Sequence, residues 1–532
     1  MKFPRCSGIL LHFTSLPARF GIGDLGPSAY EFADFLSAAG QKLWQVLPLN
    51  PTGYADSPYQ CFSAFAGNPM LLSLERLRDQ GLLQESDLAR ATPFPEDFVD
   101  YGPVIEFKMT ALRRAAQAFF ADGSRTDRSA FDRFCESARP WLDDYALFMA
   151  CKAAHQGAMW TTWEPQLRKR DPRALKEWSQ KLATERKAFQ YWQFEFFQQW
   201  ESLKSYCQQR GIRFMGDVPI YVAHDSADVW AHPELFYLDD QGRPTVVSGV
   251  PPDYFSATGQ LWGNPIYRWD LLASSGYRWW IERFRGSLAL FDMMRLDHFR
   301  GFESYWEVPG NETTAQNGRW VKGPGEGLLS ALENAFGALP IVAENLGVIT
   351  PAVENLRQKF GLPGMSLLQF AFGTDPQGPS FRPHNYSRDL AAYTGGHDND
   401  TTVGWWTSSG AGDSTRTPED VRKEHEFARA YLNFHDDSEI NWIMIRAVLE
   451  SVANLAIVPL QDVLGLGSAA RMNFPGKVSG NWKWRYRAGA LSGESSSSIL
   501  DSFRTPSFSN KARTSQTALI RRRHCRPAAA FM

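Results

Sequence analysis

Short apolar runs that end in polar residues recur along the chain, with helical stretches between them. In the first instance, Phe32, Phe35, Leu36 and Ala39 follow helical spacing, and the mostly apolar run 43–49 is typical of a buried strand. Later strand-like runs reach an acid, a histidine or an amide at 212–217, 291–298, 340–345, 391–399 and 455–462. The pattern predicts an α/β fold with a parallel barrel, in which the polar strand ends converge on one face.

Two parts of the chain depart from this alternation. Between about residues 106 and 209 the apolar spacing is helical, and strand-like runs resume on both sides. We interpret this stretch as a helical subdomain inserted into a catalytic unit of residues 1–490. Residues 491–532 change in composition, with serine at 495–498 and a basic cluster at 521–524, which is typical of a disordered tail.

Charge and composition narrow the possible partners. The chain has 532 residues and a formal net charge of −2. A nucleic acid or an anionic membrane is therefore not expected as the main partner, because both attract a basic face. The N-terminus lacks a secretory signal and no run could span a bilayer, so we expect a cytoplasmic protein with reduced cysteines. The ten histidines and six cysteines show no metal-ligand spacing, so no metal site is expected.

Aromatic residues make up 14% of the chain, including 19 Trp. Sugar rings stack on indole and phenol rings, but aromatic side chains also fill the core of any large protein, and composition alone favours the core. Aromatic residues within polar loops are the informative ones. Loop 51–60 contains Tyr54 and Tyr59, and the proline-rich stretch 248–265 contains further rings. These loops would cap either a ligand site or a partner surface.

Two acids lie at the ends of predicted strands. Arg295 and Asp297 share a strand face, and a guanidinium keeps a neighbouring carboxylate ionised, as a glycosidic nucleophile must be. A structural Arg–Asp pair explains this segment equally well. Glu344 ends another apolar strand, where desolvation raises a carboxyl pKa and suits a general acid. Taken alone, Glu344 is more simply a residue at the start of a helix.

A polar cluster at 397–400 follows Gly395 and Gly396. The glycines allow close approach of the backbone, and the row of polar side chains suits a hydroxyl-rich ligand. A turn rich in Asp and Asn is an equal alternative at this point.

A set of short segments, taken in order, resembles the amylomaltases, glycoside hydrolase family 77 of the α-amylase clan. Each segment is weak evidence alone, but the ordered set from residue 8 to about 486 is specific. The segments are 8–12, 14–17, 21–24, 53–54, 56–60, 141–146, 216–220, 248–265, 295–301, 343–347, 397–401 and 480–485.

The resemblance implies a (β/α)₈ TIM barrel with helical and loop insertions, without a separate C-terminal β-domain and without a cofactor. It implies a 4-α-glucanotransferase that moves α-1,4-glucan segments of starch, glycogen or maltooligosaccharides to the 4-hydroxyl of an acceptor by retaining double displacement. Asp297 is expected to be the nucleophile, Glu344 the acid/base, and Asp398 the third acid that holds the distorted ring. The residues expected to bind the glucan are Ser57, Tyr59, Asp217, Asp253, Trp262, Arg295, His298, His397 and Asn473.

The chain also departs from the family pattern. Phe13, Asn50, Ala55 and Asn345 stand where Pro, Gly, Gly and Asp are common in these relatives. Because Asn345 adjoins the expected acid/base, we expect it to affect the pKa of Glu344 or a sugar contact.

Two other functions remain open from the sequence. A hydrolase of the same clan would use the same carboxylates with water as acceptor, and only the family-specific loops argue against it. A glucan-binding barrel that has lost catalysis would not need a nucleophile and an acid together. No oligomeric state follows from the sequence.

Overall fold

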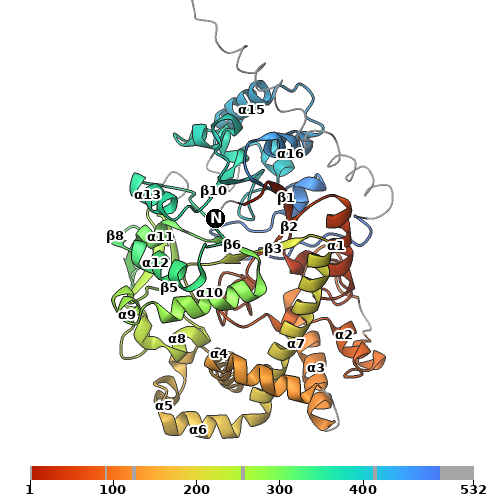
Figure 1. Cartoon of the computed structure of the whole chain (residues 1–532), viewed down its shortest axis with the longest axis vertical. Helices are drawn as coiled ribbons and strands as arrows, with labels where there is room; N and C mark the ends of the chain where they lie inside the picture. The colour runs from red at the N-terminus through yellow and green to blue at the C-terminus, as the bar shows by residue number, and fades with distance from the viewer. Residues whose placement is uncertain are drawn as a thin grey trace, which may run out of the picture.

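An eight-stranded parallel sheet forms the centre of the computed structural model, which describes residues 3–89, 93–122, 127–252, 258–410, 416–477 and 479–491 (Figure 1). The strands lie in the order β10-β11-β12-β1-β2-β3-β6-β9. Their bounds are β1 Cys6–Leu10, β2 Leu43–Gln45, β3 Arg213–Val218, β6 Met293–Leu296, β9 Ile341–Ala343, β10 Gly364–Leu367, β11 Leu390–Tyr393 and β12 Leu455–Pro459. The sheet curls until its outer strands β9 and β10 meet, where the Ala343 amide donates to the Pro363 carbonyl at 2.8 Å. It is a (β/α)₈ barrel, as expected.

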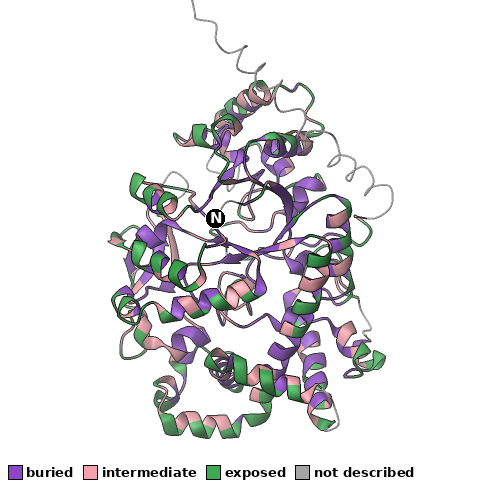
Figure 2. Ribbon diagram, in the orientation of Figure 1, coloured by how far each residue is buried: buried purple, intermediate pink, exposed green. Residues whose placement is uncertain are grey.

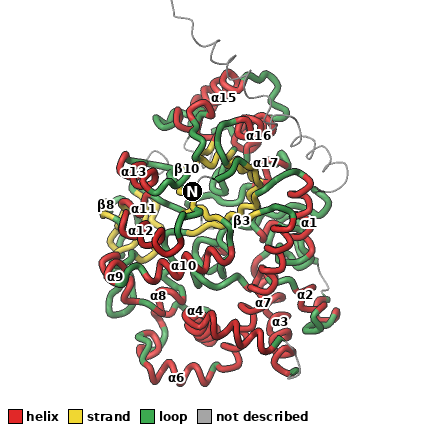
Figure 3. Tube along the Cα trace, viewed as in Figure 1, coloured by secondary structure: helices red, strands yellow, loops and turns green. Residues whose placement is uncertain are grey.

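Helices surround the barrel (Figure 3). Those that follow the barrel strands include α1, α10, α13 and α16, and each places an apolar stripe against the sheet. The α-helices are α1 Pro27–Ala38, α2 Leu74–Asp79, α3 Tyr101–Ala121, α4 Arg128–Ala154, α5 Pro165–Arg168, α6 Pro172–Lys181, α7 Ala183–Gln209, α8 Ala227–Ala231, α9 Trp269–Ser274, α10 Arg278–Leu290, α11 Arg300–Glu303, α12 Gly325–Phe336, α13 Pro351–Lys359, α14 Thr402–Thr407, α15 Pro418–Leu432, α16 Ile440–Glu450 and α17 Leu460–Val463.

Helices α3 to α7 lie between two strands that are neighbours in the sheet. Strand β2 pairs directly with β3, Leu43 opposite Arg213, although the whole helical stretch separates them in sequence. These helices occupy the lower part of the molecule in Figure 1, away from α15 and α16. The outermost of them, α6, has no buried residue (Figure 2).

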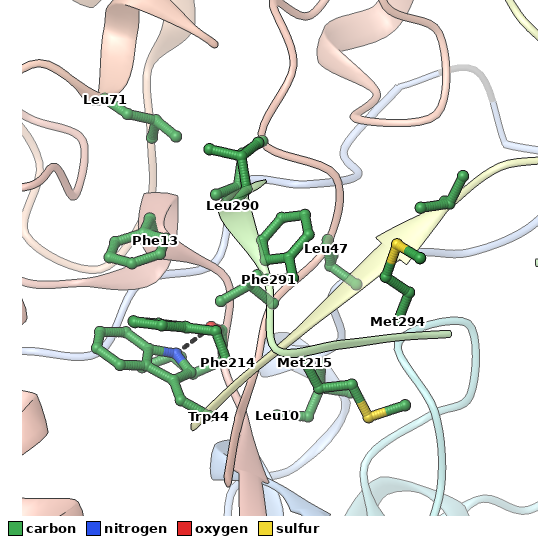
Figure 4. Packing of buried hydrophobic residues seen from close by; sticks show 14 of the residues in the cluster. Leu10, Phe13, Trp44, Leu47, Leu71, Phe214, Met215, Leu290, Phe291 and Met294 are labelled. Atoms are coloured by element: carbon green, nitrogen blue, oxygen red, sulfur yellow. Dashed lines mark hydrogen bonds between the residues drawn. The ribbon is translucent and has the colours of Figure 1, made fainter. Parts of the chain in front are cut away.

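Aromatic packing between the barrel strands and the surrounding helices joins this helical region to the sheet. Trp44 of β2 packs against Phe214 of β3, with ring centroids 5.2 Å apart, and Phe13 lies 4.8 Å from Trp44 (Figure 4). Trp200 of α7 reaches the same cluster, 4.7 Å from Phe214. Each of these large rings buries apolar area, so α7 is fixed to the barrel wall by packing.

A second sheet was not predicted from the sequence. It is antiparallel, in the order β5-β4-β7-β8, with β4 Val246–Val250, β5 Gln260–Pro265, β7 Ser304–Pro309 and β8 Arg319–Lys322. The sequence placed 248–265 in one loop, and this was wrong at its two ends: Ser248 lies on β4 and Trp262 on β5. The prolines and glycines of this stretch conceal the strand pattern, because they are depleted from strands in general.

The other strand predictions held to within a few residues, whereas β1 and β10 were missed. No described helix is both long and apolar enough to cross a membrane. Residues 492–532, most of the predicted tail, lie outside the described residues.

Candidate active site

Charged side chains gather where the barrel strands end. Asp217 is the last residue but one of β3, Arg295 lies near the end of β6 with Asp297 directly after it, and Glu344 directly follows β9. His397 and Asp398 follow β11. Because all the barrel strands are parallel, these ends lie on one face of the barrel, where reacting groups of TIM-barrel enzymes gather.

Arg295 pairs with two carboxylates at once. Its Nη1 lies 2.8 Å from Asp217 Oδ2 and 2.8 Å from Asp297 Oδ1. Burial raises the pKa of Asp217 to about 7, with Arg295 opposing that shift and the charge of Asp297 adding to it. Burial alone would lower the pKa of Arg295, but the two aspartates hold it well above its ordinary value. The predicted Arg295–Asp297 pair is therefore present.

Glu344 sits in a different environment. It is 9% exposed, and its two oxygens accept backbone hydrogen bonds from His298 at 2.8 Å and Leu346 at 2.9 Å. Burial raises its pKa to about 7, with Arg295 opposing the shift and the charge of Asp297 reinforcing it. Glu344 thus carries a proton through much of the range up to neutral pH, which suits a general acid.

The backbone adopts a left-handed conformation at His298, whose amide contacts Glu344. His298 has φ of 49°, a region that L residues other than glycine seldom occupy, and its amide donates to the Glu344 carboxyl. Burial lowers the pKa of His298 to about 3, so its ring is neutral. The ring stands edge-on to Trp262, with centroids 4.7 Å apart, which brings two predicted glucan-binding residues together beside the acid.

Asp398 is held by a segment far along the chain. Asn473 Nδ2 donates to Asp398 Oδ1 at 2.6 Å, and Arg471 Nη2 donates to the Asp398 carbonyl at 2.6 Å. His397 Nε2 lies 3.4 Å from the same Oδ1, and burial lowers the pKa of His397. The Asp398 side chain is 50% exposed, so it can still meet a ligand from the open side of the barrel.

The two glycines before this group allow a close approach, as the sequence suggested. A Cβ added to Gly395 would lie 2.9 Å from Gln369 Nε2, closer than side chains normally come. The group that comes close to the glycine backbone is a side chain of the protein and not a ligand. Gln369 Nε2 donates to the Asp400 carbonyl at 2.9 Å and holds the loop in place.

Tyr59 lies over His397, with ring centroids 5.2 Å apart and an interplanar angle of 16°. Its hydroxyl donates to Asp217 Oδ2 at 2.9 Å, so it joins the His397 loop to the Arg295 pair. Ser57 Oγ accepts from the Tyr59 amide at 3.2 Å and shapes the loop that carries the ring. Ala55, where relatives often have Gly, adopts φ of 54°, the left-handed region that favours glycine.

Two residues next to the site were not singled out from the sequence. Trp482 lies 5.7 Å from the Tyr59 ring and 5.9 Å from the His397 ring. Arg471 donates to the Asp398 carbonyl and to the Asn473 carbonyl. Trp482 stands in the Gly480–Arg485 segment of the family pattern, which was the available signal, whereas nothing in the sequence marked Arg471.

The Asn345 side chain makes its hydrogen bonds with α13 and β10. Its Nδ2 donates to Glu354 Oε1 at 2.7 Å, and its Oδ1 accepts from the Met365 amide at 2.8 Å. The side chain therefore links the end of β9 to α13 and β10 and helps to close the barrel. Both of its polar atoms are engaged there, and an effect of Asn345 on the pKa of Glu344 or on a sugar contact stays a prediction.

The remaining predictions concern residues outside this constellation. Asp253 lies outside the described residues. Among the residues that the structure describes, no group of three or more His, Cys, Asp or Glu side chains is placed to hold a metal ion. The other predicted residues are brought together by the contacts above into one site.

Comparison with known proteins gives a consistent result. The family model described as 4-alpha-glucanotransferase matches residues 11–491. The chain is 51% identical over 501 residues to a 4-alpha-glucanotransferase of Thermus thermophilus, covering 93% of this chain and 97% of that protein. A 4-alpha-glucanotransferase of Synechocystis sp. is 52% identical over 490 residues, covering 92% and 95%. The solved amylomaltase from Streptococcus agalactiae in complex with acarbose superposes with a TM-score of 0.89 at 37% identity, over 94% of this chain and 99% of that one.

Proposed function

The chain belongs to the 4-α-glucanotransferase family, glycoside hydrolase family 77, and we propose that Asp297, Glu344 and Asp398 are the acids with which it transfers α-1,4-glucan segments. The contrast between two of these acids carries the proposal. Asp297 is paired with the Arg295 guanidinium at 2.8 Å, which favours its ionised form, whereas burial raises the pKa of Glu344 to about 7. One nucleophile and one acid are what a retaining glycosidic reaction needs.

In the first step, the Asp297 carboxylate attacks the anomeric carbon of the donor. Glu344 gives its proton to the glycosidic oxygen as the bond from that oxygen to the anomeric carbon breaks. The shortened glucan leaves with a free 4-hydroxyl, and the transferred segment stays as a glycosyl ester on Asp297.

In the second step, Glu344 is a carboxylate and acts as a base. It takes the proton of the acceptor's 4-hydroxyl, whose oxygen attacks the anomeric carbon and releases Asp297. Glu344 is then protonated again, and both acids return to their starting states. The product has the same anomeric configuration as the donor, because each step inverts it once.

Around the sugar ring at the cleavage point we place Asp398, Asp217, Arg295, His397 and Tyr59. Asp398 has an exposed carboxylate for ring hydroxyls, and Tyr59 and His397 provide flat faces at the same place. The wider glucan cleft takes in Ser57, Trp262, His298 and Asn473, together with Asp253, which lies outside the described residues. Maltooligosaccharides and longer α-1,4-glucans are the proposed donors and acceptors.

The family separates this chain from the two alternatives that the sequence left open. A hydrolase of the clan and a non-catalytic binding barrel share the fold, but the family that matches the chain consists of transferases. Transfer requires that an acceptor hydroxyl reach the glycosyl ester before water does.

The proposed catalytic unit comprises residues 1–490, including the helical insertion, and residues 491–532 form an additional tail. A cytoplasmic location is supported by the five described cysteines, Cys6, Cys61, Cys135, Cys151 and Cys207, all of which are free thiols.

Incubation with maltotriose tests the function. A ladder of longer maltooligosaccharides, with glucose released in parallel, is the expected result. Maltose and glucose alone, with reducing ends rising throughout, would show that water is the acceptor and would overturn transfer. The same assay on Asp297→Asn, with glucan binding measured separately, tests the assignment of the nucleophile.

A further inference from the structure

A small pocket of about 30 Å³, partly open to solvent, has His397 in its lining. Its wall is formed by residues that follow β1, β11 and β12 and by the segment that carries Arg471. The polar side chains of the wall include His12, Ser15, His397, Asp400, Gln461 and Arg471. Leu10 and Leu47, which belong to the hydrophobic core, also line it. The pocket is large enough to hold water, and its polar groups can bind that water.

His12 is a buried imidazole in this wall that the catalytic steps leave unused. It follows the end of β1 closely and is 6% exposed. Its Nδ1 is buried and has no hydrogen-bond partner among the described residues. Buried polar atoms are almost always paired, because leaving one unpaired forfeits its bond to water. The atom is therefore expected to bind a molecule that enters the pocket.

His397 faces the same pocket from the catalytic side. Its Nε2 points to Asp398, at 3.4 Å from Oδ1, and its ring is fixed by Tyr59. A neutral imidazole donates from one nitrogen and accepts at the other, so a proton on Nε2 leaves Nδ1 as the hydrogen-bond acceptor, and a donor facing Nδ1 favours that tautomer. Which nitrogen carries the proton is thus decided by what His397 meets on the side away from Asp398.

Both imidazoles are held neutral. Burial lowers the pKa of His12 to about 3, and a charge on His397 would lower it further. Burial likewise lowers the pKa of His397, against the opposing charge of Asp398. Arg471, Asp400 and Asp462 also line the pocket, and none of the hydrogen bonds that they make with described residues reaches either ring. Water between two neutral rings is the arrangement that satisfies both.

We propose that His12 is a positioning residue for His397, linked to it through water in this pocket so that His397 keeps its proton on Nε2, towards Asp398 and the sugar. This inference rests on the proposed role of His397 at the cleavage point. A similar function is known for groups that fix the tautomer of an active-site histidine from behind. His12 itself touches neither substrate nor the reacting atoms.

Three substitutions of His12 test the proposal. In His12→Leu we expect kcat for maltotriose disproportionation to fall by about tenfold, with KM changed by less than about twofold. His12→Asn places an amide near the position of Nδ1 and should restore most of the rate. His12→Gln places its amide near the position of Nε2 and should not restore the rate. Met472→Leu, which changes an apolar part of the same wall, is the matched control and should retain the wild-type rate.

The tautomer of His397 gives a readout that a loss of packing would not move. In protein labelled with ¹⁵N-histidine, the His397 signals should report a proton on Nε2 in the wild type and in His12→Asn, and a mixture of tautomers in His12→Gln and His12→Leu. If His12→Leu does not fold, the Asn and Gln variants still decide. Equal rates and equal His397 spectra for those two variants would overturn the proposal, as would a wild-type rate in His12→Leu. If the wild type transfers no glucan, the proposed function fails, and the spectra still test the link between the two histidines.

Discussion

Asn473 donates a hydrogen bond of 2.6 Å to Oδ1 of Asp398, although 75 residues separate the two in the chain. The same segment holds the Asp398 backbone through Arg471, and the Asn473 backbone amide donates to the His397 carbonyl at 3.1 Å. One oxygen of Asp398 is therefore oriented by protein, and the other accepts no hydrogen bond from the described residues, which leaves it for a sugar hydroxyl. Asn473 was expected to bind glucan, which stays a prediction; the structure shows its contact with Asp398, our proposed third acid.

Replacement of Asn473 by Asp should place a second carboxylate against Asp398. Like charges at this distance raise each other's pKa and turn the side chains apart, so we expect kcat/KM for maltotriose to fall by about tenfold to a hundredfold. Asn473→Ala removes only the hydrogen bond and should cost about fivefold. Steady-state kinetics would measure both. Asn385→Asp adds the same charge at an exposed asparagine elsewhere and should have no effect on kcat/KM. A larger loss in Asn473→Ala than in Asn473→Asp would contradict this account.

Asp297→Asn should abolish transfer while leaving glucan binding intact. Without a nucleophile no glycosyl ester forms, and we expect kcat to fall by about a thousandfold or more. Asp292→Asn is the matched control, because Asp292 lies just before β6 and its Oδ2 accepts from the Phe214 amide at 2.8 Å, at the opposite end of the strand. Chromatography of maltotriose products and calorimetric titration with maltooligosaccharides would separate the two effects. Retained turnover in Asp297→Asn would exclude it as the nucleophile.

The raised pKa of Glu344 predicts the alkaline side of the pH profile. The first step uses the protonated form, whose fraction falls as pH rises through a pKa of about 7, so kcat/KM should decline above that pH by about tenfold per unit. A donor whose leaving group needs no proton, such as α-maltosyl fluoride, should lack this decline.

The same donor separates the two roles of Glu344. Glu344→Gln should lose nearly all activity on maltotriose, yet still form the glycosyl ester from α-maltosyl fluoride, detectable as a burst of fluoride or by mass spectrometry. The absence of any ester from the fluoride would mean that Glu344 is needed for more than proton transfer.

The strand-end acids could be predicted because their signal is local. A buried strand followed at once by Asp217, Asp297 or Glu344 is visible in the sequence, and the parallel arrangement then brings the three together. Strand β10 could not be predicted, because Gly364–Leu367 is short and contains both Gly and Ser. The direction of the Asn345 side chain depends on how β9 meets β10. The hydrogen bond between Asn473 and Asp398 depends on where a segment distant in sequence lies relative to the strand ends. Such contacts are set by tertiary packing.

A buried ion pair ties the helical insertion to the start of the barrel. Lys108 of α3 lies 3.2 Å from Asp24, and both side chains are fully inaccessible to solvent. Removing one partner leaves the other charge buried and unpaired, so Lys108→Met should lower the free energy of unfolding by about 3–5 kcal/mol. The double variant Lys108→Met/Asp24→Asn leaves no uncompensated charge and should recover a large part of that loss.

Urea unfolding of the single and double variants would measure these differences, with the exposed pair Arg114–Asp87 as the comparison. There, Arg114 is 54% exposed, its partner lies 2.7 Å away, and Arg114→Met should cost less than about 1 kcal/mol because water screens both charges. If Lys108→Met cost no more than Arg114→Met, the buried pair would contribute nothing to holding α3 against the barrel. A double variant as unstable as Lys108→Met would instead mean that the aliphatic part of Lys108, and not its charge, supplies the stability.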